Sequence, residues 1–264
     1  MKASFVKPKL YILGSKVDCV QISDVVEIVE NWIIGKSRHN YIVTSNANNV
    51  VLAVKNKEIK EAVNNSSLSV ADGISLVITA RFYGYPLKSR VYGPDLMLAL
   101  LALSEKKRYT NFFLGSTQEN LFLLEGRLKK SFPLLKIAGR YSPSFGEVPE
   151  EEKTRVEELI NGSNVDILWV GLGGPKQDIW MFEYKERINV PVMIGVGAAF
   201  DFLAGTKLQA PRWMRKSGLE WFFRLITEPN RLWRRYLVNN ILFVWYVVVE
   251  LFSNAFTCNK IDKY

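Results

Sequence analysis

Two hydrophobic patterns alternate along the chain. Short apolar runs rich in β-branched and aromatic residues predict strands near Tyr41–Ser45, Leu68–Ala71, Asn111–Leu114, Ile167–Val170 and Val192–Val196. Between them, apolar residues recur with helical spacing, which predicts helices at about Asp24–Ile34, Ala47–Val63, Pro94–Ser104, Glu119–Phe132, Glu150–Ile160 and Gln177–Arg187. The alternation predicts an α/β fold, a mainly parallel, Rossmann-like sheet with helices on both faces. Because ligands bind beyond the carboxyl ends of such strands, the loops that follow the strands are the expected site.

The composition of the chain changes near Gly205. Residues 206–240 hold eight basic and two acidic residues, a local charge of +6 within the +9 of the whole 264-residue chain. The basic residues are Lys207, Arg212, Arg215, Lys216, Arg224, Arg231, Arg234 and Arg235. The sequence therefore predicts an α/β core at residues 1–205 and a basic, aromatic appendage at residues 206–264. The excess positive charge favours an anionic partner, which is nucleic acid, anionic lipid or a phosphorylated small molecule.

An apolar run follows the basic segment. Ile241–Val249 contains nine consecutive apolar residues, far fewer than the roughly 20 that a helix needs to span a bilayer. A short apolar helix beside basic and aromatic residues is typical of a segment that lies in the membrane interface, and the sequence favours this interpretation. A terminal helix docked on the core is the alternative, and contact with a second subunit leaves a homo-oligomer open.

The few cysteines and the single histidine limit the metal sites and the redox chemistry that the chain can support. Cys19 and Cys258 lack the spacing of metal ligands, and the single histidine, His39, lies in a polar stretch that predicts a solvated loop. Sites built from several histidines are therefore excluded. Residues 1–18 contain no apolar run of secretory length, so the sequence predicts a protein that stays in the reducing environment of the cytoplasm.

Asp72 is the most informative carboxylate in the predicted loops. It follows the predicted strand Leu68–Ala71 and stands between Ala71 and Gly73, so there is space beside it. A carboxylate held in a pocket can act as a general base. Aspartate is also a frequent helix N-cap, and Asp72 stands two residues before a predicted helix at Ile74–Phe82. The spacing alone favours neither role.

A glycine-rich loop follows a later strand. Gly171, Gly173 and Gly174 suggest a dinucleotide site, but Lys176 stands where the fingerprint needs its third glycine, and no acidic residue ends the next strand. The loop therefore does not predict nicotinamide binding. Gln177, at the end of the same loop, could contact a sugar or base hydroxyl or simply open a helix.

The sequence offers arginines rather than paired carboxylates for a phosphate group. There is no Asp-x-Asp pair, so a Mg²⁺ ion held by two neighbouring carboxylates has no evident site and no metal is predicted. Arg224, Arg231 and Arg234 recur at intervals of seven and three residues, which places them on one side of a continuous helix. Pro229 is expected to restart that helix, which weakens the first interval.

Several motifs resemble those of the WecG/TagA/CpsF glycosyltransferases, in order from about Tyr41 to Tyr236. They are Asn46-Ala-Asn-Asn-Val50, Ala71-Asp-Gly73, Arg90-Val-Tyr-Gly-Pro-Asp-Leu96, Phe112-Phe-Leu-Gly115, Val170-Gly-Leu-Gly-Gly-Pro-Lys-Gln177, Gly197-Ala-Ala-Phe-Asp-Phe-Leu-Ala-Gly205, Ala210-Pro-Arg-Trp-Met214 and Gly218-Leu-Glu-Trp-Phe-Phe-Arg-Leu225. The resemblance implies an inverting, metal-independent enzyme without a cofactor. It also implies a UDP-sugar donor and an undecaprenyl-diphosphate-linked acceptor, in cell-surface polysaccharide or teichoic acid biosynthesis at the inner face of a bacterial membrane.

The resemblance also implies roles for individual residues. Asp72 falls on the catalytic base, and this decides between its two roles. Substrate binding falls to Thr44, Asn46, Arg90 and Gln177, and diphosphate binding falls to Arg224, Arg231 and Arg234. Asp178 is a departure, because the family often has glutamate there. The motifs leave open whether the sugar is N-acetylmannosamine or another hexose.

Two other function classes are alternatives. A nicotinamide-dependent oxidoreductase requires the dinucleotide loop that is broken in this sequence. A non-catalytic module that binds nucleic acid or another anionic surface could use the basic and aromatic residues of the appendage. The resemblance favours the transferase and a membrane surface over a nucleic-acid partner.

Overall fold

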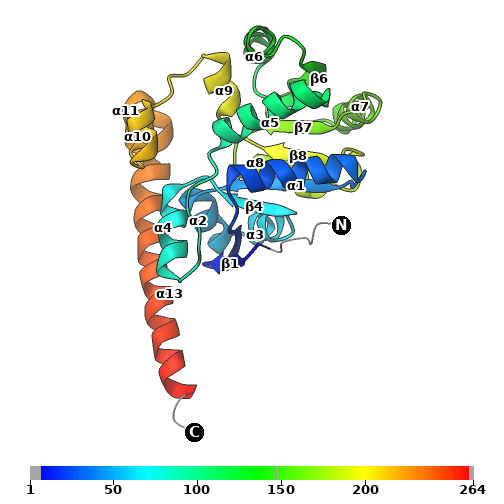
Figure 1. The fold of residues 1–264 in the computed structure, drawn as a ribbon. Coiled ribbons are helices and arrows are strands. Elements are labelled where there is room, and N and C mark those ends of the chain that lie inside the picture. The colour runs from blue at the N-terminus through cyan, green and yellow to red at the C-terminus, as the bar shows by residue number, and fades with distance from the viewer. Residues whose placement is uncertain (1–6, 145, 147, 262–264) are drawn as a thin grey trace.

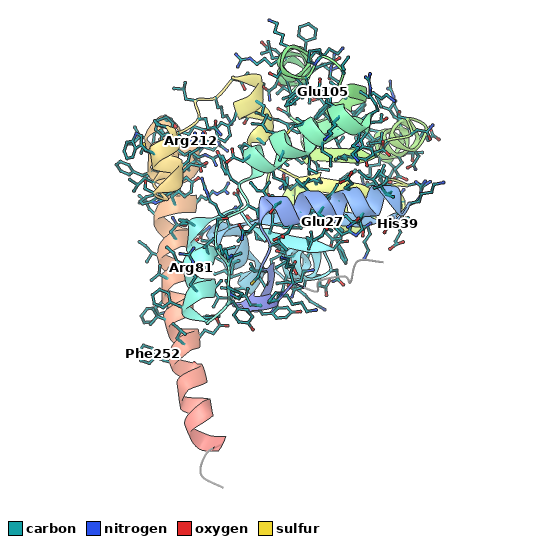
Figure 2. The ribbon with its side chains drawn as sticks, in the orientation of Figure 1. Glu27, His39, Arg81, Glu105, Arg212 and Phe252 are labelled. Carbon is teal, nitrogen blue, oxygen red and sulfur yellow. The ribbon has the colours of Figure 1, made fainter. Side chains whose placement is uncertain are left out.

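The computed structural model describes residues 7–144, 146 and 148–261, with the side chains of all of these except Lys216 and residues 254–261. Two of the expectations refer to parts of the chain outside this description, which are residues 1–6 of the N-terminal stretch and the side chain of Cys258. Cys19 is buried, and His39 lies in an exposed loop as predicted (Figure 2).

One eight-stranded sheet forms the centre of the molecule. Its strands are β1(Lys9–Ile12), β2(Ser15–Asp18), β3(Asn40–Ser45), β4(Leu68–Ala71), β5(Thr110–Gly115), β6(Lys136–Tyr141), β7(Ile167–Gly171) and β8(Val192–Gly195). Their order across the sheet is β1-β2-β4-β3-β8-β7-β5-β6, and only the β1–β2 pair is antiparallel. The predicted α/β fold with a mainly parallel sheet is therefore confirmed.

Helices cover both faces of the sheet (Figure 1). The core helices are α1(Ile22–Ile34), α2(Ala47–Lys55), α3(Lys57–Asn64), α4(Ile74–Phe82), α5(Gly93–Lys107), α6(Gln118–Ser131), α7(Glu150–Asn161), α8(Lys176–Tyr184) and α9(Ala199–Ala204). Helices α1, α5, α6 and α9 pack on one face, and α3, α7 and α8 pack on the other. The single helix predicted at Ala47–Val63 is wrong, because Asn56 ends α2 and its side chain accepts a hydrogen bond from Ile59 N at 3.1 Å to start α3.

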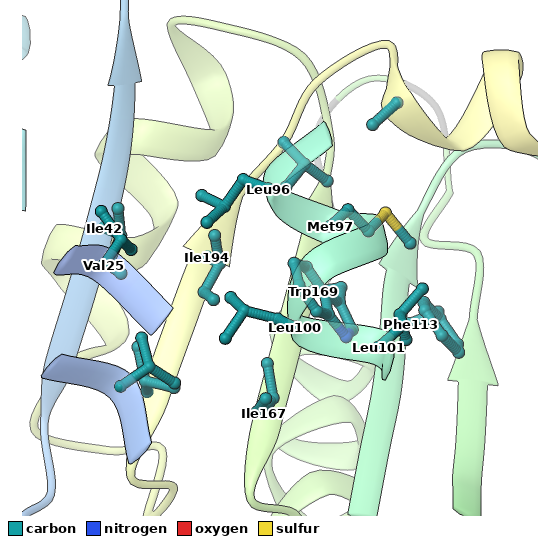
Figure 3. Close-up of a cluster of buried hydrophobic side chains, with 14 of the residues drawn as sticks. Val25, Ile42, Leu96, Met97, Leu100, Leu101, Phe113, Ile167, Trp169 and Ile194 are labelled. Atoms are coloured by element: carbon teal, nitrogen blue, oxygen red, sulfur yellow. The ribbon is translucent and has the colours of Figure 1, made fainter. Parts of the chain in front are cut away.

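The apolar face between the sheet and helices α1 and α5 forms the largest core cluster (Figure 3). Leu96 and Leu100 of α5 pack over Ile194 of β8 and its neighbours, where side chains from alternate positions of the parallel strands meet. Trp169 is fully buried in β7 and donates its Nε1 hydrogen to Asn111 Oδ1 at 2.9 Å. This packing fixes the relative positions of the strand ends on which the loops depend.

The appendage consists of short helices followed by one long helix. Its elements are α10(Arg212–Lys216), α11(Glu220–Thr227), α12(Pro229–Trp233), the π-helical turn η1(Arg234–Val238) and α13(Asn239–Ile261). Helix α12 begins at Pro229, as predicted. Helix α13 runs beside α4, and its carboxyl end extends past the core (Figure 1). Its Phe243 and Val247 are buried in a cluster with β1, β2, α2 and α4.

The apolar tail is longer than its sequence pattern indicated. The helical segment 229–253 contains an 18-residue window that has a mean hydropathy of 1.5 and is 6% buried, and the helix is long and apolar enough to cross a membrane by length and composition. The expectation of a run far too short to span was therefore wrong, because the helix continues on both sides of Ile241–Val249. One side of α13 still docks on protein: Glu250 accepts a hydrogen bond from the hydroxyl of Tyr83 in the core.

A buried carboxyl lies between α2 and α8. Asp178 has no exposed surface, and its Oδ2 accepts a hydrogen bond from Asn49 Nδ2 at 2.9 Å. Within the described part of the chain, Asp178 Oδ1 and Asn49 Oδ1 are both buried without a hydrogen-bond partner. Burial raises the pKa of Asp178 to about 7, against smaller lowering by Gln177 and Asn49. A proton on Asp178 turns one of its two carboxyl oxygens from an acceptor into a donor.

Replacing Asp178 by asparagine is expected to stabilise the protein at alkaline pH. The raised pKa gives wild type a stabilising contribution that is complete below pH about 4 and is lost as pH rises through about 7, whereas asparagine stays neutral throughout. Asp178→Asn should therefore unfold at a higher temperature than wild type at pH 8, by roughly 2–4 °C for each kcal/mol gained, with a smaller difference at pH 5. Thermal unfolding followed by circular dichroism measures this, with the exposed Glu186→Gln as control. An equal difference at both pH values would contradict it.

Candidate active site

The candidate site lies at the carboxyl ends of β3 and β4, beside a switch point of the sheet. At this point the connections of two neighbouring strands run to opposite sides of the sheet. From β3 the chain continues to β4 on one side, whereas β8, the other neighbour of β3, is reached from β7. Crevices at such switch points, outside the carboxyl ends of the strands, are where open α/β sheets bind ligands. A pocket of about 300 Å³ opens here, and the appendage forms its second wall. The charged residues that line it are Asp72, Arg90, Glu220, Arg224 and Arg235, and Asn46 is among its polar residues.

Asp72 is positioned by the end of β4. Its backbone N donates to Ser45 O at 2.8 Å, and its Oδ1 accepts a hydrogen bond from the backbone N of Gly93, the first residue of α5, at 2.9 Å. Gly73 is the N-cap of α4 and leaves Asn46 close by, since a Cβ on Gly73 would lie 3.2 Å from Asn46 Cβ. The alternative that Asp72 caps α4 is therefore wrong, because its carboxylate points to α5 and the pocket.

The environment of Asp72 favours its neutral form more than water does. Burial raises the pKa of Asp72 to about 6, and the negative charge of Glu220 adds to this. Arg90, the hydrogen bond from Gly93 and Arg224 act in the opposite direction. Asp72 therefore releases its proton just below neutral pH and is able to take one up in a reaction at pH 7.

Arg90 joins the core to the appendage. Its Nη2 donates to Glu220 Oε2 at 2.7 Å and to Arg215 O at 3.2 Å, and its guanidinium lies 4.4 Å from the centre of the Tyr92 ring. The Arg90 and Glu220 side chains are only 15% and 9% exposed. Arg90 thus lines the pocket, and its hydrogen bonds mainly hold the appendage over Asp72.

Two predicted substrate residues lie beneath the pocket rather than on its surface. Thr44 Oγ1 donates to Gly195 O at 2.8 Å and so bridges the ends of β3 and β8. Gln177 Oε1 accepts a hydrogen bond from Gly197 N at 3.0 Å and holds the loop after β8. Both side chains are buried, and neither lines the pocket. Asn46 does line it, and its Oδ1 also accepts a hydrogen bond from Asn49 N at the start of α2.

The three predicted diphosphate-binding arginines do not share one face. Arg224 lines the pocket, whereas Arg231 and Arg234 are exposed outside it, and Arg231 pairs with Glu228. The expected common face assumed one continuous helix, but α11 ends at Thr227 and a π-helical turn follows α12. Arg235 lines the pocket instead.

Sequence reasoning missed Glu220 and Arg235 as pocket residues. Glu220 stands inside one of the family motifs, so its position carried a signal that was not used. Arg235 is adjacent to Arg234, and only the π-helical turn distinguishes which of the two faces the pocket.

A larger hollow of about 420 Å³ lies beyond the ends of β5 and β7. It is lined mainly by apolar and aromatic groups, including Trp180 and Tyr184, whose rings stack with centres 4.6 Å apart. The pocket beside Asp72 is the better candidate for chemistry, because a carboxyl with a shifted pKa and several cationic groups converge on it.

Comparisons with known proteins identify the relatives of the chain. The family model described as Glycosyl transferase WecG/TagA/CpsF family matches residues 10–256. The chain is similar to the N-acetylglucosaminyldiphosphoundecaprenol N-acetyl-beta-D-mannosaminyltransferases of Bacillus spizizenii and Bacillus subtilis, with 34% identity over 166 residues, 63% of this chain and 62% of each relative. The Staphylococcus aureus enzyme of the same name is 30% identical over 165 residues, 62% of this chain and 63% of the relative.

These alignments cover less than two thirds of the relatives' length. The family model, by contrast, extends from β1 through most of α13 and includes every residue that lines the pocket. The chain therefore belongs to the WecG/TagA/CpsF family of glycosyl transferases.

Proposed function

We propose that the protein transfers a sugar of the N-acetylmannosamine type from a UDP donor onto a lipid-diphosphate-linked N-acetylglucosamine. The observation that carries this proposal is the Asp72 carboxyl, with a pKa near neutrality, in a pocket walled by a cationic appendage. The printed names of the similar enzymes supply the sugar and the acceptor. A bacterial product of this kind would enter cell-surface polysaccharide or teichoic acid synthesis.

In this reaction Asp72 acts as the general base. A hydroxyl oxygen of the acceptor attacks the anomeric carbon of the donor and forms the new glycosidic bond, while its proton passes to Asp72. The bond between that carbon and the β-phosphate oxygen breaks, and its electron pair leaves with UDP. Attack from the face opposite UDP inverts the anomeric configuration. The positive charge beside the pocket stabilises the departing diphosphate, so that this proposal requires no metal ion.

Removing the proposed base should abolish most of the activity. With UDP-N-acetylmannosamine and an N-acetylglucosamine-diphospholipid analogue in EDTA, Asp72→Asn should release UDP about 10²- to 10⁴-fold more slowly than wild type. Asp166→Asn is the matched control, because Asp166 lies at the opposite, amino end of β7 and an amide oxygen can still accept its hydrogen bond from Thr110 N. Activity that disappears from wild type in EDTA and returns with Mg²⁺ would contradict the metal-free mechanism.

The pH dependence of the rate should report the ionisation of Asp72. The rate is expected to fall below pH about 6, where the base becomes protonated, and to level off above it. Glu220→Gln removes a negative charge that raises the pKa of Asp72, so the inflection should move to lower pH. Glu228→Gln changes an appendage carboxylate that pairs with Arg231 and should leave the inflection in place. An inflection that is the same in wild type and Glu220→Gln would argue against this assignment.

We further propose that the appendage attaches the protein peripherally to the cytoplasmic face of the membrane. On α13, Trp245 and Phe252 are 61% and 64% exposed, and Phe82 of the adjoining α4 is 77% exposed. Figure 2 shows Phe252 directed away from the core. Because Phe243 and Val247 occupy the other side of α13, the helix can place one apolar side in lipid while the core stays outside, which is the geometry of an interfacial helix.

Polar substitutions on the outer side of α13 should weaken membrane binding. Trp245→Ser combined with Phe252→Ser is expected to reduce partitioning into vesicles of phosphatidylcholine and phosphatidylglycerol at least about tenfold, because both side chains lose apolar burial. Phe122→Ser, at an exposed position of α6, is the control and should bind as wild type. Sedimentation with vesicles measures the effect. Wild-type protein that resists extraction by alkaline carbonate would contradict peripheral attachment.

A further inference from the structure

Two arginines in the pocket wall, Arg224 and Arg235, have aromatic neighbours but no ion-pair partner among the described residues. The Arg224 guanidinium lies 5.5 Å from the centre of the Phe202 ring, and the Arg235 guanidinium lies 5.8 Å from the centre of the Tyr236 ring. The Nε atoms of Arg224 and Arg235 are buried without a hydrogen-bond acceptor, and among the described side chains neither guanidinium lies within 4.0 Å of a carboxylate. Both groups line the same pocket as Asp72. Buried guanidinium groups are normally paired, since an unsatisfied charged donor costs free energy. An unpaired pair of them points to an anion that binds there.

The backbone explains why Arg235 faces the pocket. Asn239 N donates to Arg234 O, five residues earlier, which is the hydrogen bond of a π-helical turn. Such a turn holds one residue more than an α-helical turn, and each residue rotates the side-chain direction by about 100°. The side chain of Asn239 is fixed beyond the turn, because its Nδ2 donates to Asn48 Oδ1 at 2.7 Å. The turn between α12 and this anchor therefore presents Arg235 and Tyr236 to the pocket.

The neighbouring arginines have other surroundings. Arg231 Nη2 and Nε both bond Glu228 Oε2, at 2.5 and 2.7 Å, and Glu228 in turn lies 3.5 Å from Lys207. Arg234 is exposed, with its guanidinium 5.2 Å from the centre of the Trp233 ring. Arg231 thus stabilises the start of α12, and Arg234 points to the outer surface.

The charges of the pocket favour an anionic ligand. Of the three arginines that line it, Arg90 is neutralised by Glu220. Arg224 and Arg235 remain, opposite the single carboxyl of Asp72. Burial lowers the pKa of Arg235, and the nearby positive charge of Arg224 adds to this, so an anion that binds beside both arginines would favour the charged form of Arg235. Each guanidinium fork matches the oxygens of one phosphoryl group.

We propose that Arg224 and Arg235 together bind a diphosphate, and that Arg231 and Arg234 do not. The inference rests on the proposed function, in which a diphosphate occurs both in the nucleotide and in the lipid-linked acceptor. Three probes distinguish these cases. Inorganic pyrophosphate tests binding of a diphosphate alone, UDP tests the nucleotide, and a short-chain prenyl-diphosphate-N-acetylglucosamine tests the acceptor.

The test compares single variants of the full-length protein in detergent. Calorimetry measures the affinity of each probe for wild type, Arg235→Gln, Arg235→Lys, Arg234→Gln and Arg155→Gln. Arg155 is exposed on α7, at the opposite side of the molecule from the appendage (Figure 1), and controls for the loss of one positive charge. The expected result is at least about tenfold weaker pyrophosphate binding by Arg235→Gln, a smaller loss with Arg235→Lys, which keeps the charge without the fork, and affinity close to wild type for the other two.

Each outcome decides between the arginines. If Arg235→Gln binds UDP more weakly than wild type, Arg224 and Arg235 bind the leaving nucleotide. If Arg235→Gln binds only the prenyl analogue more weakly, the two arginines bind the acceptor. Both results support the inference. Equal pyrophosphate affinity in wild type and both Arg235 variants would overturn it, as would a larger loss in Arg234→Gln. If Arg235→Gln does not fold, Arg235→Lys decides by the same criterion.

The binding measurements do not depend on turnover. The Arg235 variants could lose pyrophosphate affinity while the wild-type protein transfers no sugar. That result would support the diphosphate site and refute the proposed transferase. Transfer by wild type at an unchanged rate in Arg235→Gln, with unchanged affinity, would refute the diphosphate site alone.

Discussion

The buried ion pair between Arg90 and Glu220 is the contact on which the site depends. It joins the loop before α5 to the first residue of α11, and its two side chains are almost removed from water. Removing one partner of such a pair typically costs about 3–5 kcal/mol, because the other charge stays buried alone. Arg90 also donates to the carbonyl of Arg215. The appendage is therefore held as a wall of the pocket by charge as well as by the apolar contacts of α13.

The same ion pair sets the chemistry of Asp72. Glu220 raises the pKa of the Asp72 carboxyl and Arg90 lowers it, so that their opposite effects partly cancel and burial becomes the deciding influence. Without Glu220, Arg90 would shift the pKa of Asp72 downward, and without Arg90, Glu220 would shift it upward. Because a general base works best when its pKa lies near the working pH, the paired arrangement suits proton transfer better than either residue alone would.

Apolar periodicity predicted the parallel strands β3, β4, β5, β7 and β8 and the strand-end position of Asp72, because both follow from burial that the sequence pattern records directly. It missed β1, β2 and β6, which are strands of four to six residues at the two edges of the sheet. It also placed Thr44 in the substrate pocket, whereas the hydroxyl bridges β3 and β8 below the surface. The face that each appendage arginine presents was not predictable, because it depends on an interrupted helix and a π-helical turn, which the spacing of charged residues does not encode.

The appendage has two sides with different chemistry, and this links the proposed membrane contact to the proposed reaction. Arg235 faces inward just before α13, and Trp245 faces outward ten residues later, a separation of roughly 15 Å along a helix. A helix that crossed the bilayer would carry Trp245 toward the lipid tails and pull the docked core into them. A helix lying along the interface keeps both residues near one depth, and a lipid-linked diphosphate lies at that depth. Interfacial attachment is therefore the arrangement in which an anchored acceptor reaches Asp72 without leaving the membrane.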